Sequence, residues 1–238
     1  MLNGKKLIIF DLDGTLIDSV SVWNEVDRRY ITALGGCADG VGVRAQRDAK
    51  LCEFLASADP YRDYCIFMGQ KYGSSLSADE LVRLRYEIAD NLVANEVDYK
   101  PCADEFLRKL KKRGYTMVIA STTLRANLEV YLTRNQNIIS KAPLDGIFDA
   151  MYTREDASEM KPSPAILERV MRDFNVSANE CVVFEDSLIG IQAANAAGID
   201  VIAVHDASSA GDKEEITRRA KAYFESYKDI MESLKWEF

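Results

Sequence analysis

The sequence lacks long apolar runs: no stretch approaches the ~20 residues that a membrane-spanning helix needs. The apolar run nearest the N-terminus, residues 7–10, is too short for the hydrophobic part of a signal peptide. Basic residues are outnumbered by acidic ones, and the formal net charge of −8 does not favour a nucleic-acid partner. We therefore expect a cytoplasmic protein with no membrane or nucleic-acid partner.

Histidine and paired cysteines are also scarce. The single histidine, His205, has no partner histidine, so we expect a structural role for it and not that of a catalytic base. The five cysteines are scattered, odd in number and form no C-x-x-C pair. We interpret them as small buried apolar residues in a reducing compartment.

Short apolar runs at 7–10, 117–120, 182–184 and 201–204 are typical of strands buried on both faces, and 147–153 is a weaker candidate. Helical patterns lie between these runs from about residue 100 onward. This alternation predicts an α/β fold with an open, mostly parallel sheet.

Residues 19–97 contain no strand-like run and predict an all-helical domain. One helix begins at a capping box from Ser77 to Glu80, and another has Asp59 as its N-cap. We therefore predict a core domain made of residues 1–18 and 98–238, with a helical domain inserted after its first strand.

Two carboxylates, Asp11 and Asp13, follow the first strand in "LIIFDLDGTL". Residues two apart in extended backbone point to the same side. At roughly 5 Å the two charges repel by about 3 kcal/mol at an effective dielectric near 20. A cation, a bound proton or water must offset this repulsion. The pair could also form an Asp-Gly turn with Gly14, whereas the position of that glycine does not fit a calcium-binding EF-hand loop.

Polar residues follow two further predicted strands. Ser121 and Thr122 follow 117–120, where they could hold a ligand or cap the next helix. Glu185 and Asp186 follow 182–184, where they could bind a cation or complement a helix dipole. Lys161 precedes a helix start and could be catalytic or a solvated loop residue.

These groups together predict one site, because ligands of open α/β sheets bind beyond the carboxyl ends of the strands. Several carboxylates suit Mg²⁺, a hard ion that prefers oxygen ligands. A lysine, hydroxyls and helix N-termini suit a phosphate. A metal, a phosphate and a free carboxylate in one place indicate phosphoryl transfer with an aspartate as nucleophile.

The sequence resembles the haloacid dehalogenase superfamily. The segments "DLDGT" (11–15), "IAST" (119–122), "KPSP" (161–164) and "VVFEDSLIGIQAA" (182–194) are similar to its four motifs and occur in the same order. The helical insertion is similar to the cap of subfamily I. The resemblance covers essentially the whole chain and implies a Rossmann-like core with a helical cap.

The resemblance also implies roles for the first motif and for the lysine. Asp11 would be the nucleophile that forms an aspartyl-phosphate and would also bind Mg²⁺. Asp13 would be the general acid and base, and its backbone carbonyl would bind the metal. Gly14 would allow the sharp turn and would belong to the phosphate-binding residues. Lys161 would balance the charge of the phosphate and of Asp11.

The remaining motifs would complete the site. Ser121 or Thr122 would hold the phosphate, and we favour Ser121. Asp186 would bind Mg²⁺ directly, with Glu185 acting through water or on the other ligands. The dehalogenases lack an acid–base aspartate at the position of Asp13, so dehalogenation is not expected.

Substrate contacts are less well marked. Arg44, Arg47 and Lys50 form a basic cluster in the insertion, where one of them could meet an anionic part of the substrate or all could form a solvated helix face. The phosphonate-cleaving relatives use a cap lysine, for which Lys50 and Lys71 are unmarked candidates.

We expect a Mg²⁺-dependent phosphatase acting on a small phosphorylated metabolite, such as a sugar phosphate or a phosphoglycolate-like monoester. One alternative is a sugar phosphomutase resembling β-phosphoglucomutase, and the other is a non-catalytic ligand-binding protein.

Overall fold

The structure is a computed structural model that describes residues 1–37, 42–54 and 57–236. It contains two compact units: unit 1 comprises Met1–Ser19 and Val97–Phe238, and unit 2 comprises Val20–Glu96. The assignment of these parts as a catalytic core and a cap stays a prediction.

Unit 1 is built on a six-stranded sheet in the order β3-β2-β1-β4-β5-β6, in which every neighbouring pair is parallel. The predicted α/β fold with a mostly parallel sheet is therefore confirmed. The strands are β1 (Leu7–Phe10), β2 (Thr116–Ala120), β3 (Ala150–Tyr152), β4 (Cys181–Glu185), β5 (Asp200–Val204) and β6 (Ala222–Phe224).

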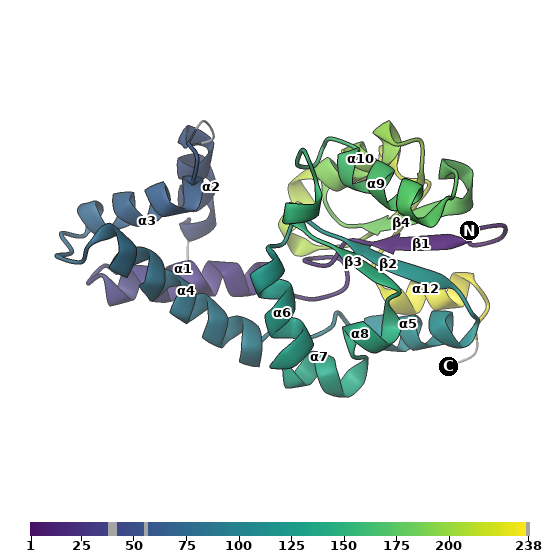
Figure 1. Ribbon diagram of the computed structural model, residues 1–238, viewed down its shortest axis with the longest axis horizontal. Coiled ribbons are helices and arrows are strands. Elements are labelled where there is room, and N and C mark those ends of the chain that lie inside the picture. The colour runs from purple at the N-terminus through teal and green to yellow at the C-terminus, as the bar shows by residue number, and fades with distance from the viewer. Residues whose placement is uncertain (38–41, 55–56, 237–238) are drawn as a thin grey trace. The chain divides into compact units, whose positions relative to one another are not determined.

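The central strand β1 is buried on both faces, as its continuous apolar run predicts. Leu7 and Ile9 belong to an apolar cluster with residues of α9 (Ala165–Phe174) and α10 (Leu188–Ala196). Phe10 lies on the other face, where its ring stacks on Phe184 with 4.8 Å between centroids and meets Phe106 edge-on. Figure 1 shows α9 and α10 on one side of the sheet and α5 (Ala103–Lys112) and α12 (Tyr227–Ser233) on the other.

The remaining helices of unit 1 are α6 (Arg125–Thr133), α7 (Gln136–Lys141), α8 (Leu144–Ile147) and α11 (Lys213–Arg219). The weak strand candidate 147–153 resolves into the end of α8 followed by the short strand β3. The edge strand β6 was not predicted, because its three half-buried residues make no distinct apolar run.

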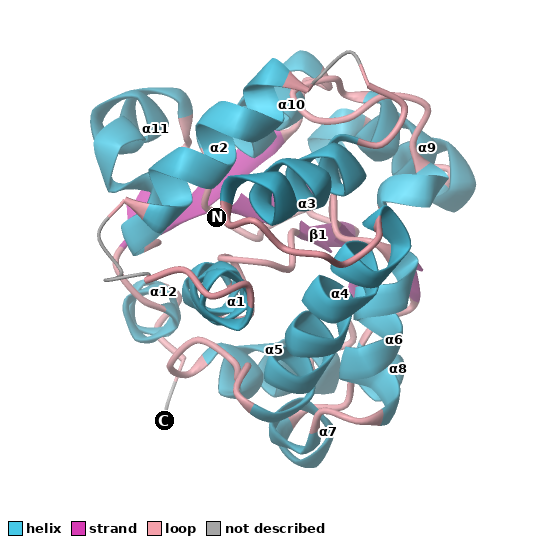
Figure 2. Ribbon diagram, turned by 90° about the vertical axis from the view of Figure 1, so that its left-hand side faces the viewer, coloured by secondary structure: helices cyan, strands magenta, loops and turns pink. Residues whose placement is uncertain are grey.

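The described part of unit 2 contains four helices and no strand. Figure 2 draws these helices in cyan. They are α1 (Val20–Ala33), α2 (Val43–Glu53), α3 (Pro60–Lys71) and α4 (Ala78–Asn95). The Ser77–Glu80 capping box and the Asp59 N-cap are both present. None of the described helices in either unit has the length and apolarity to cross a membrane.

An ion cluster lies inside unit 2. The fully buried carboxylate of Asp27 accepts hydrogen bonds from Nη1 of Arg47 at 3.0 Å and from Nε of Arg85 at 3.0 Å. Because an unpaired buried charge is very unfavourable, each of these groups depends on the others.

The expectation for the cysteines was partly wrong. Cys65 and Cys181 are buried, but Cys37 and Cys52 are exposed. Cys37 follows the end of α1 and Cys52 lies in the last turn of α2, so helical periodicity overestimated the burial of both cysteines.

Candidate functional site

The predicted site residues of unit 1 lie at the carboxyl ends of neighbouring strands. Asp11 follows β1, Ser121 follows β2, and Glu185 ends β4. Since β2, β1 and β4 are adjacent and parallel, these ends meet at one edge of the sheet. The sheet itself fixes Asp11, whose N–H donates to the carbonyl of Phe184 at 3.0 Å.

Lys161 joins the ends of β1 and β4. Its Nζ donates to Oδ1 of Asp11 and to Oε2 of Glu185, each at 2.7 Å. All three side chains are at least 92% buried, since their exposed fractions are 4%, 8% and 2%. The ammonium therefore balances two carboxylates that could not share a buried site without it.

Asp186 is held by the loop that carries the first motif. Thr15 Oγ1 donates to Asp186 Oδ1 at 2.7 Å, and both residues are buried. Gly14 has φ +82°, and a Cβ built there would lie 2.6 Å from Asp186 Oδ2. A side chain at position 14 would thus be strained and would also displace the carboxylate.

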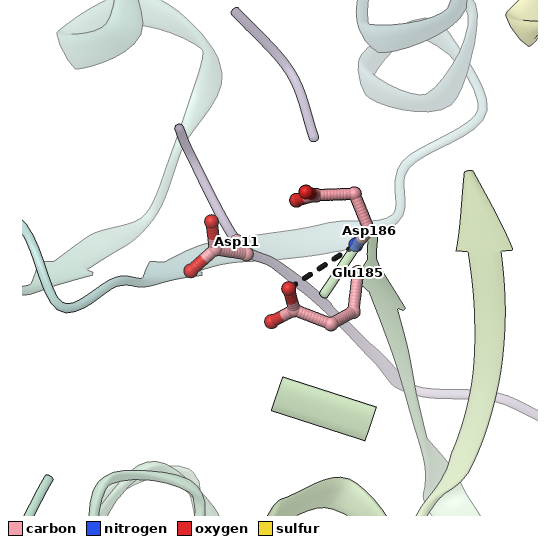
Figure 3. Close-up of side chains that lie close together, drawn as sticks. All are labelled: Asp11, Glu185 and Asp186. Carbon is pink, nitrogen blue, oxygen red and sulfur yellow. Dashed lines mark hydrogen bonds between the residues drawn. The ribbon is translucent and has the colours of Figure 1, made fainter. Parts of the chain in front are cut away.

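The carboxylate of Glu185 is fixed from its other side. Its Oε1 accepts hydrogen bonds from the N–H groups of Asp186 and Ser187, both at 3.1 Å, and from Ser187 Oγ at 2.8 Å. The first of these contacts is the dashed line in Figure 3. Gly190 makes room for this arrangement, because a Cβ there would lie 2.0 Å from Glu185 Oε2.

The electrostatics of this cluster favour added positive charge. Burial raises the pKa of Asp11 to about 7, with Lys161 opposing the rise and Glu185 adding to it. Burial and then the charges of Glu185 and Asp11 raise the pKa of Asp186 well above its ordinary value. Burial alone would lower the pKa of Lys161, but the two carboxylates outweigh it and raise that pKa.

The same residues suit a divalent cation. Asp11, Glu185 and Asp186 each offer one carboxylate oxygen, and these atoms all lie within 4.8 Å of one another. Figure 3 shows the three side chains gathered at the ends of β1 and β4. Oxygen-only donors with excess negative charge fit a hard ion such as Mg²⁺. A buried acidic cluster able to hold a metal is thus present where the sequence predicted one.

Asp13 lies beside this cluster and is only partly buried. Its Oδ1 accepts a hydrogen bond from Ser19 Oγ at 2.5 Å. Burial raises the pKa of Asp13, and the hydrogen bond from Ser19 opposes the rise. A raised pKa brings a carboxyl group closer to the range in which it can both give and take a proton.

The two candidates for phosphate contact differ in their surroundings. Ser121 is 1% exposed, its N–H donates to the carbonyl of Tyr152 at 3.0 Å, and its Oγ accepts from the N–H of Thr123 at 3.3 Å. Thr122 is partly exposed. The preference for Ser121 stays a prediction.

The basic cluster of the insertion is split by the structure. Arg47 is paired with the buried Asp27, whereas Lys50 pairs with Glu53 at 2.7 Å on the surface of α2. Arg44 belongs to α2, but its side chain lies outside the described part of the protein. Their role in substrate binding stays a prediction.

Several residues that shape the site were not predicted. Thr15 and Ser19 hold the carboxylates of Asp186 and Asp13. Lys100 Nζ donates to the carbonyls of Gly14 at 2.5 Å and of His205 at 2.6 Å, and so braces the turn after Asp13. Thr15 could have been suspected from its place next to the two aspartates. Nothing in the sequence marks Ser19 or Lys100, because a serine before a helix and a lysine after one are usual surface residues.

The family comparison decides the identity of this fold. Residues 8–204 match the sequence profile of the haloacid dehalogenase-like hydrolases, which is more than half of the chain. The chain belongs to this family. The resemblance inferred from the four motifs is therefore confirmed, as is the expectation of an enzyme, a phosphoric monoester hydrolase of this type.

Two curated members of the family align with nearly the whole chain. The protein CbbY of Rhodobacter capsulatus is 24% identical over 220 residues, covering 87% of this chain and 88% of its own length. A phosphoglycolate phosphatase of Colwellia psychrerythraea is 26% identical over 239 residues, covering 98% of this chain and 99% of its own.

A solved structure of the same fold is that of a putative β-phosphoglucomutase from Thermotoga maritima. It superposes with a TM-score of 0.77 and 23% sequence identity, covering 97% of this chain and 98% of its own. At this identity the likeness bears on the fold alone.

Proposed function

We propose that this haloacid dehalogenase-like hydrolase is a Mg²⁺-dependent phosphatase that cleaves a small phosphorylated metabolite, with Asp11 as its nucleophile. One observation carries the proposal. Three carboxylates, Asp11, Glu185 and Asp186, lie within reach of one cation, and Lys161 is bound to two of them. A nucleophile, a cation site and a fixed ammonium group are what phosphoryl transfer to a carboxylate requires.

The first step is attack of an Asp11 carboxylate oxygen on the phosphorus. The bond from phosphorus to the alcohol oxygen breaks, and the alcohol takes a proton from Asp13. Lys161 favours the ionised form of Asp11 against the effect of burial, because its ammonium group lies 2.7 Å from the carboxylate and partly offsets its desolvation. A divalent cation held by the acidic cluster would neutralise the approaching phosphate and lower its repulsion from Asp11.

The second step returns Asp11 to its starting state. Asp13 takes a proton from a water molecule, whose oxygen attacks the phosphoryl group, and the bond between phosphorus and Asp11 breaks. Asp13 is suited to both steps because it lies two residues from Asp11 and its pKa is raised.

The substrate class is drawn from relatives and from the form of the site. The aligned phosphoglycolate phosphatase takes its name from a small anionic phosphomonoester. With a cation bound to the three carboxylates, the cluster and the Lys161 ammonium would offer a small region of positive charge that fits one phosphate group. We therefore assign a small phosphorylated metabolite to this site.

The test is turnover by the purified protein with Mg²⁺ and a panel of phosphorylated metabolites, followed by assays of free phosphate and of isomerised sugar phosphate. The panel contains phosphoglycolate and β-glucose 1-phosphate, the latter with and without glucose 1,6-bisphosphate. Free phosphate that disappears in Asp11→Asn and on chelation of Mg²⁺ supports the proposal. Isomerisation without free phosphate would instead mean a phosphomutase, and neither product would favour a substrate outside the panel or a non-catalytic protein.

A further inference from the structure

A lysine between α4 and α5 uses its whole ammonium group inside unit 1. The side chain of Lys100 is 13% exposed. Its Nζ donates to the carbonyl of Gly14 at 2.5 Å, to the carbonyl of His205 at 2.6 Å and to Oδ2 of Asp206 at 2.8 Å. An ammonium group has three donors, and these three acceptors use all of them. The group is therefore held in one position.

The three contacts connect the ends of two strands that are not neighbours. Gly14 belongs to the loop after β1, whereas the other two acceptors follow β5. Between β1 and β5 in the sheet lies β4, which leads into Asp186 of the acidic cluster. Lys100 thus ties together the loops on both sides of the strand that carries two of the three cluster carboxylates.

The contact with Gly14 bears on the cation site through Thr15. The accepting carbonyl belongs to the peptide group between these two residues, so the ammonium group fixes the orientation of that peptide group. The Thr15 hydroxyl in turn holds Oδ1 of Asp186 at 2.7 Å. Gly14 has φ +82° and no side chain to restrict it, so a contact from outside the loop is needed to hold its carbonyl in place.

We propose that Lys100 is a positioning residue for the divalent cation. By holding the peptide group after Gly14 it keeps the Thr15 hydroxyl on Asp186, which leaves the other oxygen of Asp186 available to the cation. The proposal rests on the Mg²⁺ site of the proposed function and deepens it by naming a residue that acts through two others. Lys100 itself binds neither the cation nor the phosphate.

Positioning and charge would change cation binding in opposite directions. A positive charge near the site repels a cation, so its removal would strengthen Mg²⁺ binding if charge alone acted. Loss of a group that orients a metal ligand instead weakens metal binding about 10- to 100-fold. Lys100→Met keeps most of the length of the side chain without its charge, and we expect it to raise the Kd of Mg²⁺ about tenfold.

Isothermal titration calorimetry of the EDTA-treated protein with Mg²⁺, without substrate, measures this Kd. Lys5→Met is the matched control. Nζ of Lys5 also donates to a backbone carbonyl, that of Asn179 at 2.9 Å, and to the Asp200 carboxylate at 2.8 Å, and its side chain is 7% exposed. These partners lie before β4 and at the start of β5, the end of the sheet opposite the site. Lys5→Met should therefore change the Kd by less than about twofold.

A double-mutant cycle with Thr15→Val shows whether Lys100 acts through Thr15. If it does, adding Lys100→Met to Thr15→Val should raise the Kd by less than about a further twofold, because the contact through which the lysine acts is already lost. Full additivity of the two effects would overturn the proposal. So would a Lys100→Met protein that binds Mg²⁺ as tightly as wild type, or more tightly.

Urea unfolding shows whether the variants fold, because Lys100→Met leaves the Asp206 carboxylate without its ammonium partner. If that variant does not fold, Lys100→Met combined with Asp206→Asn removes both charges and is measured in its place, with the same rise in Kd expected. A wild type that bound Mg²⁺ but released no phosphate would count against the phosphatase and not against the role of Lys100. A wild type that bound no Mg²⁺ would overturn this role.

Discussion

The hydroxyl of Thr15 donates a hydrogen bond to Oδ1 of Asp186, which lies 171 positions later in the sequence. The two oxygens are 2.7 Å apart, and both residues are buried. The bond joins the loop after β1 to the end of β4. It leaves the other oxygen of Asp186 available to a cation and fixes the direction in which that oxygen points. The geometry of the acidic cluster therefore depends on a neutral residue that binds no ligand itself.

Replacing Thr15 with valine should weaken cation binding and leave the fold intact, because valine keeps the shape of threonine but cannot donate. We expect the Mg²⁺ concentration that gives half-maximal activity to rise about tenfold or more, the usual effect of losing a group that orients a metal ligand. Activity assays at increasing Mg²⁺ concentrations measure this half-maximal concentration. Thr217→Val is the control, since Thr217 donates to a backbone carbonyl on the exposed helix α11. Equal Mg²⁺ requirements in both variants would contradict the role of Thr15.

Adding one methyl group at Gly190 should inactivate the enzyme. The new Cβ would meet the Glu185 carboxylate, which contacts Lys161, so the carboxylate must move and the ammonium group loses a partner. We expect kcat/KM for Gly190→Ala to fall at least about a hundredfold, because small displacements of catalytic groups have effects of this size. Gly146→Ala is the control, since a Cβ there meets a neighbouring atom at an ordinary 3.5 Å. Full activity in Gly190→Ala would show that Glu185 can relax without consequence.

The stability of the metal-free protein should fall as the pH rises from about 4 to 7. Burial raises the pKa of Asp11 to about 7 from an ordinary value of 3.8. Between these values the folded state binds a proton that the unfolded state does not, so the free energy of unfolding decreases with increasing pH in this window.

Thermal unfolding of the EDTA-treated protein at several pH values tests this. Asp11→Asn cannot titrate, so its unfolding temperature should decline less over the same range. Added Mg²⁺ should reduce the decline in wild type, because a cation favours the ionised carboxylates. Identical pH profiles for wild type and Asp11→Asn would mean that Asp11 is not the group that takes up the proton.

The sheet and the acidic cluster could be predicted because local patterns determine them. An unbroken apolar run followed by charged residues, as at Phe10–Asp11 and Phe184–Glu185, marks the end of a buried strand. Parallel topology then brings such ends together without further information. The helix starts at Asp59 and Ser77 were equally local, since a cap and its partner lie within one turn.

The supporting residues could not be predicted because their partners are distant in the sequence. Ser19 and Lys100 belong to segments whose patterns predict ordinary helices and loops. Arg47 illustrates the same limit. Its place in a basic cluster predicts an exposed residue, but in the structure it pairs with Asp27 from another helix. A contact between side chains of separate elements leaves no periodic signal in either one.

The buried ion cluster should be decisive for the stability of unit 2. Asp27→Asn keeps the shape of the side chain but leaves Arg47 and Arg85 without their shared anion inside the helices. Removing one member of a buried ion group costs about 3–5 kcal/mol. Glu87→Gln removes one charge from an exposed pair on α4 and should change stability by less than about 1 kcal/mol.

Urea unfolding followed by the helical circular dichroism signal compares the two variants, and Asp27→Asn should lose helix at a clearly lower urea concentration. If both unfolded at the wild-type midpoint, the arginines would have to reach water or another anion in the variant.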